Sequence, residues 1–265
     1  MLKDKKLFLF DIDGVIKLGD VVVDGAIQLY DYINKIGGKS IFITNNSTKG
    51  GKDYVSYFEK LGFQVDETNF LTALTVTTEY LKKHYPNDLI HVMGTKSLVE
   101  ELKKNGLRVT QEYDKNVSVV LVGYDTELTF DKVVTVCKLL QTLDVTYFAT
   151  NLDLKCPVPY GFIPDCGAIT SFIQIATDKE PKFLGKLAPE MVFQALSATK
   201  FKKEETLVIG DRLYTDIACG INAGVDTCAV FMGEVQEKDL ETSEIQPTYK
   251  FQSVKELLEA IKSEK

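Results

Sequence analysis

The sequence predicts an α/β fold in which one α/β unit is inserted into another. Short apolar runs, typical of buried strands, alternate with longer stretches whose apolar residues recur at helical spacing. Three of the apolar runs end in clusters of polar residues, and these runs lie toward the two ends of the 265-residue chain. The same alternation in the middle of the chain carries none of these clusters. We therefore expect a core formed by residues 1–79 and 181–265, with a second unit inserted at residues 80–180.

The core is expected to start with a buried strand and to end with an amphipathic helix. Gly37 and Gly38 should end its first helix, because glycine readily adopts the left-handed conformation at a helix C-terminus. The expected elements, in chain order, are strand 7–10, helix 25–36, strand 40–43, helices 52–61 and 72–84, strand 206–209, helix 215–223 and strand 226–231. The final helix is predicted by the spacing of Val254, Leu257, Leu258 and Ile261.

The inserted stretch repeats the alternation of strands and helices on its own. Its expected elements are strand 89–93, helix 96–105, strand 117–122, helix 130–143, strand 145–149 and helix 168–177. The segment 156–167 is rich in proline and glycine, and we expect it to be a loop. An inserted unit without the polar clusters of the core suits a cap that covers a site.

Composition excludes several classes of protein. The net charge of −7 argues against a nucleic-acid surface, which needs a basic stripe. No stretch approaches the 18 apolar residues of a membrane span, and the charged N-terminal segment does not resemble a signal peptide. The five cysteines form no Cys-x-x-Cys pair, and the two histidines make a structural zinc site improbable. We therefore expect a cytoplasmic protein with reduced thiols.

The most informative pair of residues follows the first strand. Asp11 and Asp13 are two positions apart, so on an extended backbone their carboxylates point the same way. They lie at the carboxyl end of a strand, the edge at which open α/β sheets bind ligands. Two such carboxylates repel each other unless a cation or a proton intervenes. One could be an ionised nucleophile and the other a protonated acid, with a hard cation between them.

Further polar groups lie after two other strands and between them, and they can converge on the same edge of the sheet. They are Thr44-Asn45-Asn46-Ser47 after the second strand, Gly185-Lys186, Gly210-Asp211-Arg212 after a later strand, and Thr215-Asp216. An acidic protein can bind an anionic substrate only with local positive charge. A bound cation, Lys186 and N–H groups at helix N-termini would supply it.

In these segments the sequence resembles the haloacid dehalogenase (HAD) superfamily of phosphatases. It is most similar to the NagD-like and para-nitrophenylphosphatase-like subfamily, whose cap is of class IIA type. Besides the polar clusters above, the matching residues include Ala149-Thr150-Asn151, Asp153 and Gly161-Phe162-Ile163-Pro164. The chain departs from the usual family pattern at Leu187, at Leu152, and in Pro164-Asp165-Cys166-Gly167. The resemblance implies a Rossmann-like, doubly wound parallel-sheet core with an inserted α/β cap.

The resemblance also implies a reaction, the Mg²⁺-dependent hydrolysis of small phosphate monoesters through an aspartyl-phosphate. Asp11 would be the nucleophile and Asp13 the general acid and base. Asp11, Asp211 and the backbone carbonyl of Asp13 would hold Mg²⁺. Asp216 would be a further ligand or would orient the catalytic lysine. The phosphate would be bound by Thr44, Asn45, Asn46 and Lys186, and the leaving group by Asn151 and Asp153 of the cap.

Several alternatives remain open at this stage. A phosphosugar mutase on the same scaffold would use the same aspartate, and a phosphate-sensing module of the response-regulator type would share the acidic strand end. The placement of Asp13 favours an enzyme, since a regulator has no need for a general acid. Sugar phosphates, polyol phosphates and nucleoside monophosphates all fit as small-molecule substrates. A homodimer or higher homo-oligomer formed through the cap is also left open.

Overall fold

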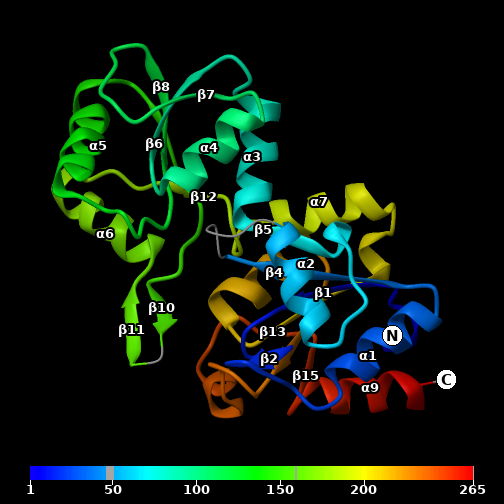
Figure 1. The fold of residues 1–265 in the computed structure, drawn as a ribbon. Helices are drawn as coiled ribbons and strands as arrows, with labels where there is room; N and C mark the ends of the chain where they lie inside the picture. The colour runs from blue at the N-terminus through cyan, green and yellow to red at the C-terminus, as the bar shows by residue number, and fades with distance from the viewer. Residues whose placement is uncertain (46–50, 159, 265) are drawn as a thin grey trace. The chain divides into compact units, whose positions relative to one another are not determined.

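The computed structural model describes residues 1–45, 51–158 and 160–264, and the chain forms two compact units (Figure 1). The first unit comprises Met1–Thr44, Gly51–Leu71 and Lys186–Lys265, and the second is built mainly from Thr72–Gly185. The boundary expected at residue 80 falls inside a helix of the second unit, α3 (Ala73–His84). Within the described ranges, no helix combines the length and the apolar character that crossing a bilayer requires.

The first unit contains a six-stranded sheet in the order β15-β14-β13-β1-β4-β5. Its strands are β1 (Leu7–Asp11), β4 (Lys39–Thr44), β5 (Phe70–Thr72), β13 (Thr206–Gly210), β14 (Asp226–Val230) and β15 (Tyr249–Phe251). β1 pairs in parallel with both β4 and β13, with Phe10 opposite Phe42 on one side and Ile209 on the other. The carboxyl ends of these three neighbouring strands therefore meet at one edge of the sheet.

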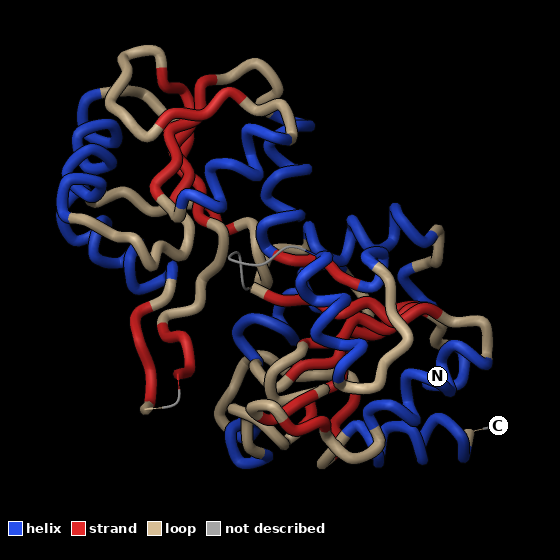
Figure 2. The backbone as a smooth tube through the Cα atoms, in the orientation of Figure 1, coloured by secondary structure: helices blue, strands red, loops and turns tan. Residues whose placement is uncertain are grey.

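Helices cover the sheet of the first unit, as Figure 2 shows by colour. They are α1 (Ala26–Lys35), α2 (Gly51–Lys60), α7 (Glu190–Thr199), α8 (Ala218–Ala223) and α9 (Val254–Ser263). Short helical turns lie at Leu2–Asp4, Glu67–Asn69, Lys203–Glu205 and Glu237–Glu241, a π-helix lies at Leu213–Ile217, and β2 (Lys17–Leu18) pairs with β3 (Val21–Val22). The four apolar residues predicted to form the buried face of the last helix are all buried in α9.

The core of the first unit is strongly aromatic. Phe42, at the centre of β4, lies in ring contact with Phe10 of β1, Tyr30 of α1 and Phe58 of α2. These rings are buried, and offset or edge-on aromatic pairs add about 0.5–1.5 kcal/mol each beyond the burial of their area. This packing fixes β1 and β4 beneath the two helices and so fixes the strand ends that carry the polar clusters.

The second unit has a five-stranded sheet of its own, in the order β12-β9-β8-β6-β7, and all of its pairs are parallel. The strands are β6 (Leu89–Met93), β7 (Arg108–Thr110), β8 (Val117–Val122), β9 (Thr146–Ala149) and β12 (Lys182–Phe183). Side chains of α3 and α4 (Lys96–Lys104) pack on one face of this sheet. Side chains of α5 (Phe130–Thr142) and α6 (Cys166–Thr177) pack on the other. The unit is therefore also doubly wound.

The predicted α/β class with two α/β units is confirmed, and one local prediction is wrong. The segment expected to be a loop at 156–167 instead contains β10 (Lys155–Val158) and β11 (Gly161–Pro164), an antiparallel hairpin. Its apolar residues, among them Val158 and Phe162, outweigh the proline and glycine signals that suggested a loop. The helix expected at 215–223 is a π-helix followed by the short α8.

Candidate active site

Three aspartates come together at the carboxyl edge of the first sheet. Asp11 is the last residue of β1, Asp211 directly follows β13, and Asp216 lies in the π-helix after it. Carboxylate oxygens of the three lie within 4.8 Å of one another, and all three residues are buried. Because β1 and β13 are parallel neighbours, their carboxyl ends alone bring Asp11 and Asp211 close together.

Lys186 joins this cluster from a distant part of the sequence. Its ammonium forms an ion pair with Asp11 and lies 2.9 Å from Oδ1 of Asp216. Although burial opposes it, the charges of these two carboxylates raise the pKa of Lys186 above its ordinary value. The lysine is therefore a fixed positive charge beside Asp11. The structure thus brings together four of the residues that the sequence analysis singled out.

Asp211 has the surroundings that best suit a bound cation. Burial raises its pKa to about 8, and the negative charges of Asp11 and Asp216 add to the effect. Its Oδ2 accepts a hydrogen bond from the N–H of Glu234 at 2.7 Å, while its buried Oδ1 has no hydrogen-bond partner among the described residues. An unsatisfied carboxylate oxygen amid two further carboxylates is the arrangement that a hard divalent cation relieves. The donor set therefore fits Mg²⁺.

Asp216 has both of its oxygens engaged by the protein. Oδ1 faces Lys186, and Oδ2 accepts the N–H of Arg212 at 3.1 Å. Burial raises its pKa to about 6, an effect that the lysine opposes. The residue belongs to a π-helical turn, a feature often found at functional sites. These contacts favour a role in orienting Lys186 over direct coordination of a cation.

Two glycines make room for the Asp211 carboxylate. A Cβ atom added to Gly14 would lie 2.4 Å from Asp211 Oδ2, and one added to Gly233 would lie 1.9 Å from the same atom. Gly14 has φ of +86°, which also favours glycine. Sequence reasoning did not single out Gly233, because nothing in the surrounding sequence indicates that its backbone approaches a carboxylate far away along the chain.

The neighbouring strand β4 supplies the groups expected to bind phosphate. Thr44 ends this strand and is buried, and Asn45 follows it. The side chain of Tyr54, in α2, forms a hydrogen bond with the Thr44 side chain, and burial raises the pKa of Tyr54 to about 12. Tyr54 was not predicted as a site residue, since only the packing of α2 brings it here. Asn46 lies outside the described residues.

Asp13 differs from the buried carboxylates because its side chain is 61% exposed. It forms an ion pair with Lys17, four residues further along the chain. An exposed carboxylate two residues after Asp11 is open to solvent. This accessibility suits a group that exchanges protons, and it distinguishes Asp13 from Asp11, whose charge is held by Lys186.

The two residues expected to recognise the leaving group lie in the second unit, and both are buried. Asn151 Nδ2 donates hydrogen bonds to Asp165 Oδ1 at 3.0 Å and to Asp153 Oδ2 at 3.3 Å. Asp165 in turn caps the N-terminus of α6. Next to this network, Cys166 is fully buried, and burial raises the pKa of its thiol to about 11. The network ties the end of β9 to the start of α6.

The fold and the site together define a class, an α/β enzyme with a buried, lysine-balanced carboxylate cluster at the edge of a parallel sheet. Family models described as haloacid dehalogenase-like hydrolase and HAD-hydrolase-like match residues 8–108 and 183–257. The acid sugar phosphatase of Staphylococcus aureus is 31% identical over 97% of this chain and 98% of its own. The chain belongs to the haloacid dehalogenase-like hydrolases, which confirms the family predicted from the motifs.

Solved structures agree over nearly the whole length of the chain. The 4-nitrophenylphosphatase of Thermotoga maritima superimposes with a TM-score of 0.90 and 31% identity, covering 98% of both chains. NagD from Escherichia coli K-12 superimposes with a TM-score of 0.86 and 29% identity, covering 95% of this chain and 98% of its own. The predicted similarity to NagD-like and para-nitrophenylphosphatase-like proteins is thus confirmed.

Proposed function

We propose that the protein is a Mg²⁺-dependent phosphatase that hydrolyses small phosphate monoesters, such as sugar or polyol phosphates or nucleoside monophosphates. The observation that carries the proposal is the buried group formed by Asp11, Lys186, Asp211 and Asp216. It offers a nucleophile, a fixed cation beside it, and a cation-binding carboxylate within one small volume. The phosphatase names of the relatives support the same reaction class.

In the first half-reaction, an oxygen of Asp11 attacks phosphorus, and the bond from phosphorus to the ester oxygen breaks. Asp13 gives a proton to the departing alcohol. The side chain of Lys186 neutralises charge on both the nucleophile and the phosphoryl oxygens. In the second half-reaction, water attacks the aspartyl-phosphate, Asp13 takes a proton from that water, and phosphate leaves with Asp11 regenerated.

Asp11 and Asp211 would hold the cation, together with the backbone carbonyl of Asp13. When bound, Mg²⁺ would neutralise part of the charge of the transferred phosphoryl group. The hydroxyl of Thr44 and the N–H of Asn45 are proposed to donate to phosphoryl oxygens, and Asn46 is proposed to assist. Tyr54 would hold the Thr44 side chain in place through its hydrogen bond.

The reaction is tested by measuring phosphate release from a panel of phosphate esters, with and without Mg²⁺. Activity should require Mg²⁺ and be lost on chelation. Asp11→Asn should abolish turnover while the melting temperature stays similar, because the amide is nearly isosteric but is not a nucleophile. Near-normal activity of this variant in a clean preparation would remove Asp11 from its role. Transfer of the phosphoryl group to a second sugar, with little released phosphate, would indicate a mutase.

Recognition of the leaving group is proposed to involve the segment that contains Asn151 and Asp153. The hydrogen bond that Asn151 donates to Asp153 supports an ordered loop at the end of β9, and this loop is proposed to set substrate preference. Substitution of either residue should change relative kcat/KM among esters by at least about tenfold, the scale of one hydrogen bond lost to a polar substrate. A proportional loss with every ester would show that the pair only shapes the turn.

The expected surroundings and assembly of the protein also remain proposals. All five cysteines are free thiols, which supports a reducing compartment such as the cytoplasm. Exposed apolar side chains on helices of the second unit, among them Phe172 and Ile175 of α6, support self-association through the cap. Sedimentation analysis of wild type and Ile175→Glu would test this, and a monomeric wild type would refute it.

A further inference from the structure

Lys17 makes three contacts with the segment that carries the proposed general acid. This segment, the nucleophile loop, consists of residues 12–14 and directly follows the proposed nucleophile, Asp11. The N–H of Lys17 donates to the carbonyl of Ile12 at 3.1 Å, and the carbonyl of Lys17 accepts the N–H of Gly14 at 2.8 Å. Its ammonium pairs with Asp13 Oδ1. One residue thus contacts each of the three positions of the loop.

The ammonium of Lys17 is itself held in place by the first unit. It donates to the carbonyl of Gly19 at 3.1 Å, in the turn between β2 and β3. It also lies 5.8 Å from the centre of the Tyr57 ring, close to the outer limit of a cation–π contact. The lysine side chain is only 14% exposed, although its partner carboxylate is 61% exposed. A long and flexible side chain is therefore fixed, and it presents its charge to one oxygen of Asp13.

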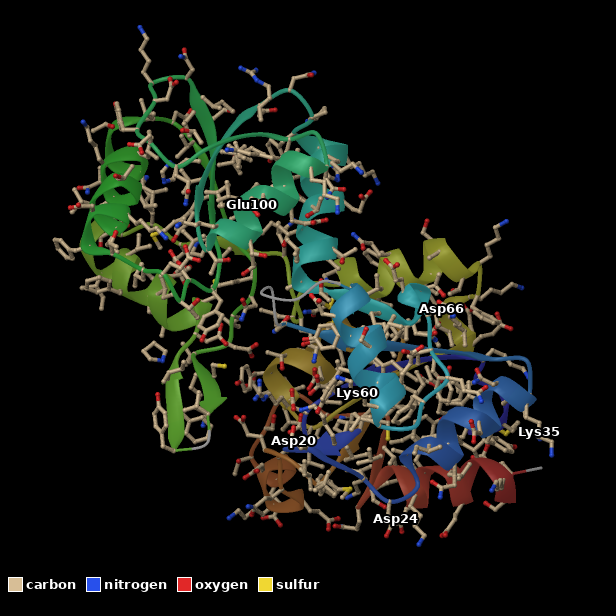
Figure 3. The ribbon with its side chains drawn as sticks, in the orientation of Figure 1. Asp20, Asp24, Lys35, Lys60, Asp66 and Glu100 are labelled. Atoms are coloured by element: carbon tan, nitrogen blue, oxygen red, sulfur yellow. The ribbon has the colours of Figure 1, made fainter. Side chains whose placement is uncertain are left out.

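The turn that holds Lys17 is anchored further by Asp20, which lies in it and is labelled in Figure 3. The Tyr57 hydroxyl is 3.5 Å from Asp20 Oδ1, so α2 and the β2–β3 turn approach each other around the lysine. Lys17 engages Oδ1 of Asp13, and the Asp13 side chain is otherwise largely exposed, so we expect its second carboxylate oxygen to exchange protons. A carboxylate fixed through one oxygen can present the other oxygen to the group with which it exchanges a proton.

We propose that Lys17 is a positioning residue for the reaction, which holds the Asp13 carboxylate so that its second oxygen meets the leaving-group oxygen. This inference rests on the proposed function, in which Asp13 protonates the departing alcohol. Loss of the positioning should slow the departure of poor leaving groups, which need a proton. Loss of the positioning should matter little for p-nitrophenyl phosphate, because p-nitrophenolate leaves without a proton.

The experiment compares Lys17→Met with wild type on glycerol 1-phosphate and on a series of aryl phosphates of rising leaving-group pKa. We expect kcat/KM for glycerol phosphate to fall at least about tenfold, since general acid catalysis contributes about 10²–10⁴-fold. The value for p-nitrophenyl phosphate should fall less than about threefold, and the dependence of rate on leaving-group pKa should steepen. Lys17→Arg, which keeps a cation at this position, should restore part of the glycerol phosphate activity.

Lys255→Met is the matched control, because Lys255 forms an ion pair with Asp24 at 2.8 Å in the same unit but outside the nucleophile loop. It should leave the leaving-group dependence unchanged. Equal losses of Lys17→Met on all esters, at an unchanged melting temperature, would overturn the proposal. So would a Lys17→Arg variant that keeps its fold but behaves as badly as Lys17→Met.

Asp13→Asn separates failure of this inference from failure of the proposed function. If Asp13 is the general acid, this variant alone must steepen the leaving-group dependence, and Lys17→Met should change it in the same direction by a smaller amount. If the leaving-group dependence of Asp13→Asn were the same as that of wild type, the proposed role of Asp13 itself would be refuted. A steep dependence in Asp13→Asn with a wild-type dependence in Lys17→Met would refute only the role of Lys17.

Discussion

Replacement of Asp211 by asparagine should stabilise the protein when no divalent cation is present. Burial and two neighbouring carboxylates raise the pKa of Asp211 from 3.8 to about 8. Between these pH values the folded protein keeps a proton that the unfolded chain releases, so stability falls as the pH rises through this window. With 1.36 kcal/mol for each unit of pKa difference, the cost at pH 8 is on the order of 5 kcal/mol.

Asparagine removes this cost because its amide stays neutral at every pH. Its side-chain oxygen can still accept the Glu234 N–H, and its NH₂ group can donate to the neighbouring carboxylates. At pH 8 in EDTA, Asp211→Asn should therefore melt roughly 10–20 °C above wild type, at about 2–4 °C for each kcal/mol in a chain of this size. At pH 4.5 the two proteins should differ little, because the wild-type carboxyl is then protonated in the folded state.

Thermal melting followed by circular dichroism at pH 4.5, 6 and 8 provides the assay. Asp24→Asn is the control, since Asp24 is an exposed carboxylate paired with a lysine and should give no such gain. Added Mg²⁺ should raise the melting temperature of wild type but not of Asp211→Asn, because a cation stabilises only a folded state that binds it. A variant that melts at or below wild type at pH 8 would refute the proposed electrostatic cost.

Three further substitutions test other parts of the site. Gly233→Ala should lower activity at least about tenfold and raise the Mg²⁺ concentration needed, because the added Cβ would overlap the Asp211 carboxylate. Titration of activity with Mg²⁺ checks this. Tyr54→Phe should raise KM and the inhibition constant for inorganic phosphate about two- to tenfold, with kcat less affected, because the Thr44 side chain loses a hydrogen bond. Leu187→Pro should lower both activity and melting temperature, because Leu187 has φ of +97° and proline is confined near −65°; unchanged melting would contradict this.

The parts of the protein that the sequence predicted are those encoded locally. The strand at 7–10 is a continuous apolar run, and the last helix repeats its apolar residues at helical spacing, so both were predicted near their observed bounds. Asp11 and Asp211 were predicted to meet because residues at the ends of parallel strands share an edge of the sheet. The structure places both at that edge.

The residues that were missed depend on contacts between distant parts of the chain. Tyr54 reaches Thr44 only through the packing of α2, and Gly233 approaches Asp211 only because the loop after β14 passes that carboxylate. A tyrosine on an amphipathic helix or a glycine in a loop has many ordinary explanations in a sequence. The hairpin β10–β11 was missed for the opposite reason, since its proline and glycine residues gave a strong but misleading local signal.

The position of β1 within its sheet has a consequence for biosynthesis. β1 lies between β4, which follows soon after it, and β13, which pairs Leu7 with Thr206. During translation, the edge of β1 that pairs with β13 stays unpaired until the whole second unit has been synthesised. An unpaired apolar strand edge is prone to intermolecular association, so the nascent chain should depend on chaperones until β13 emerges. Asp11, at the end of β1, is thus synthesised before the second unit, yet the site to which it belongs is complete only after β13 has been made.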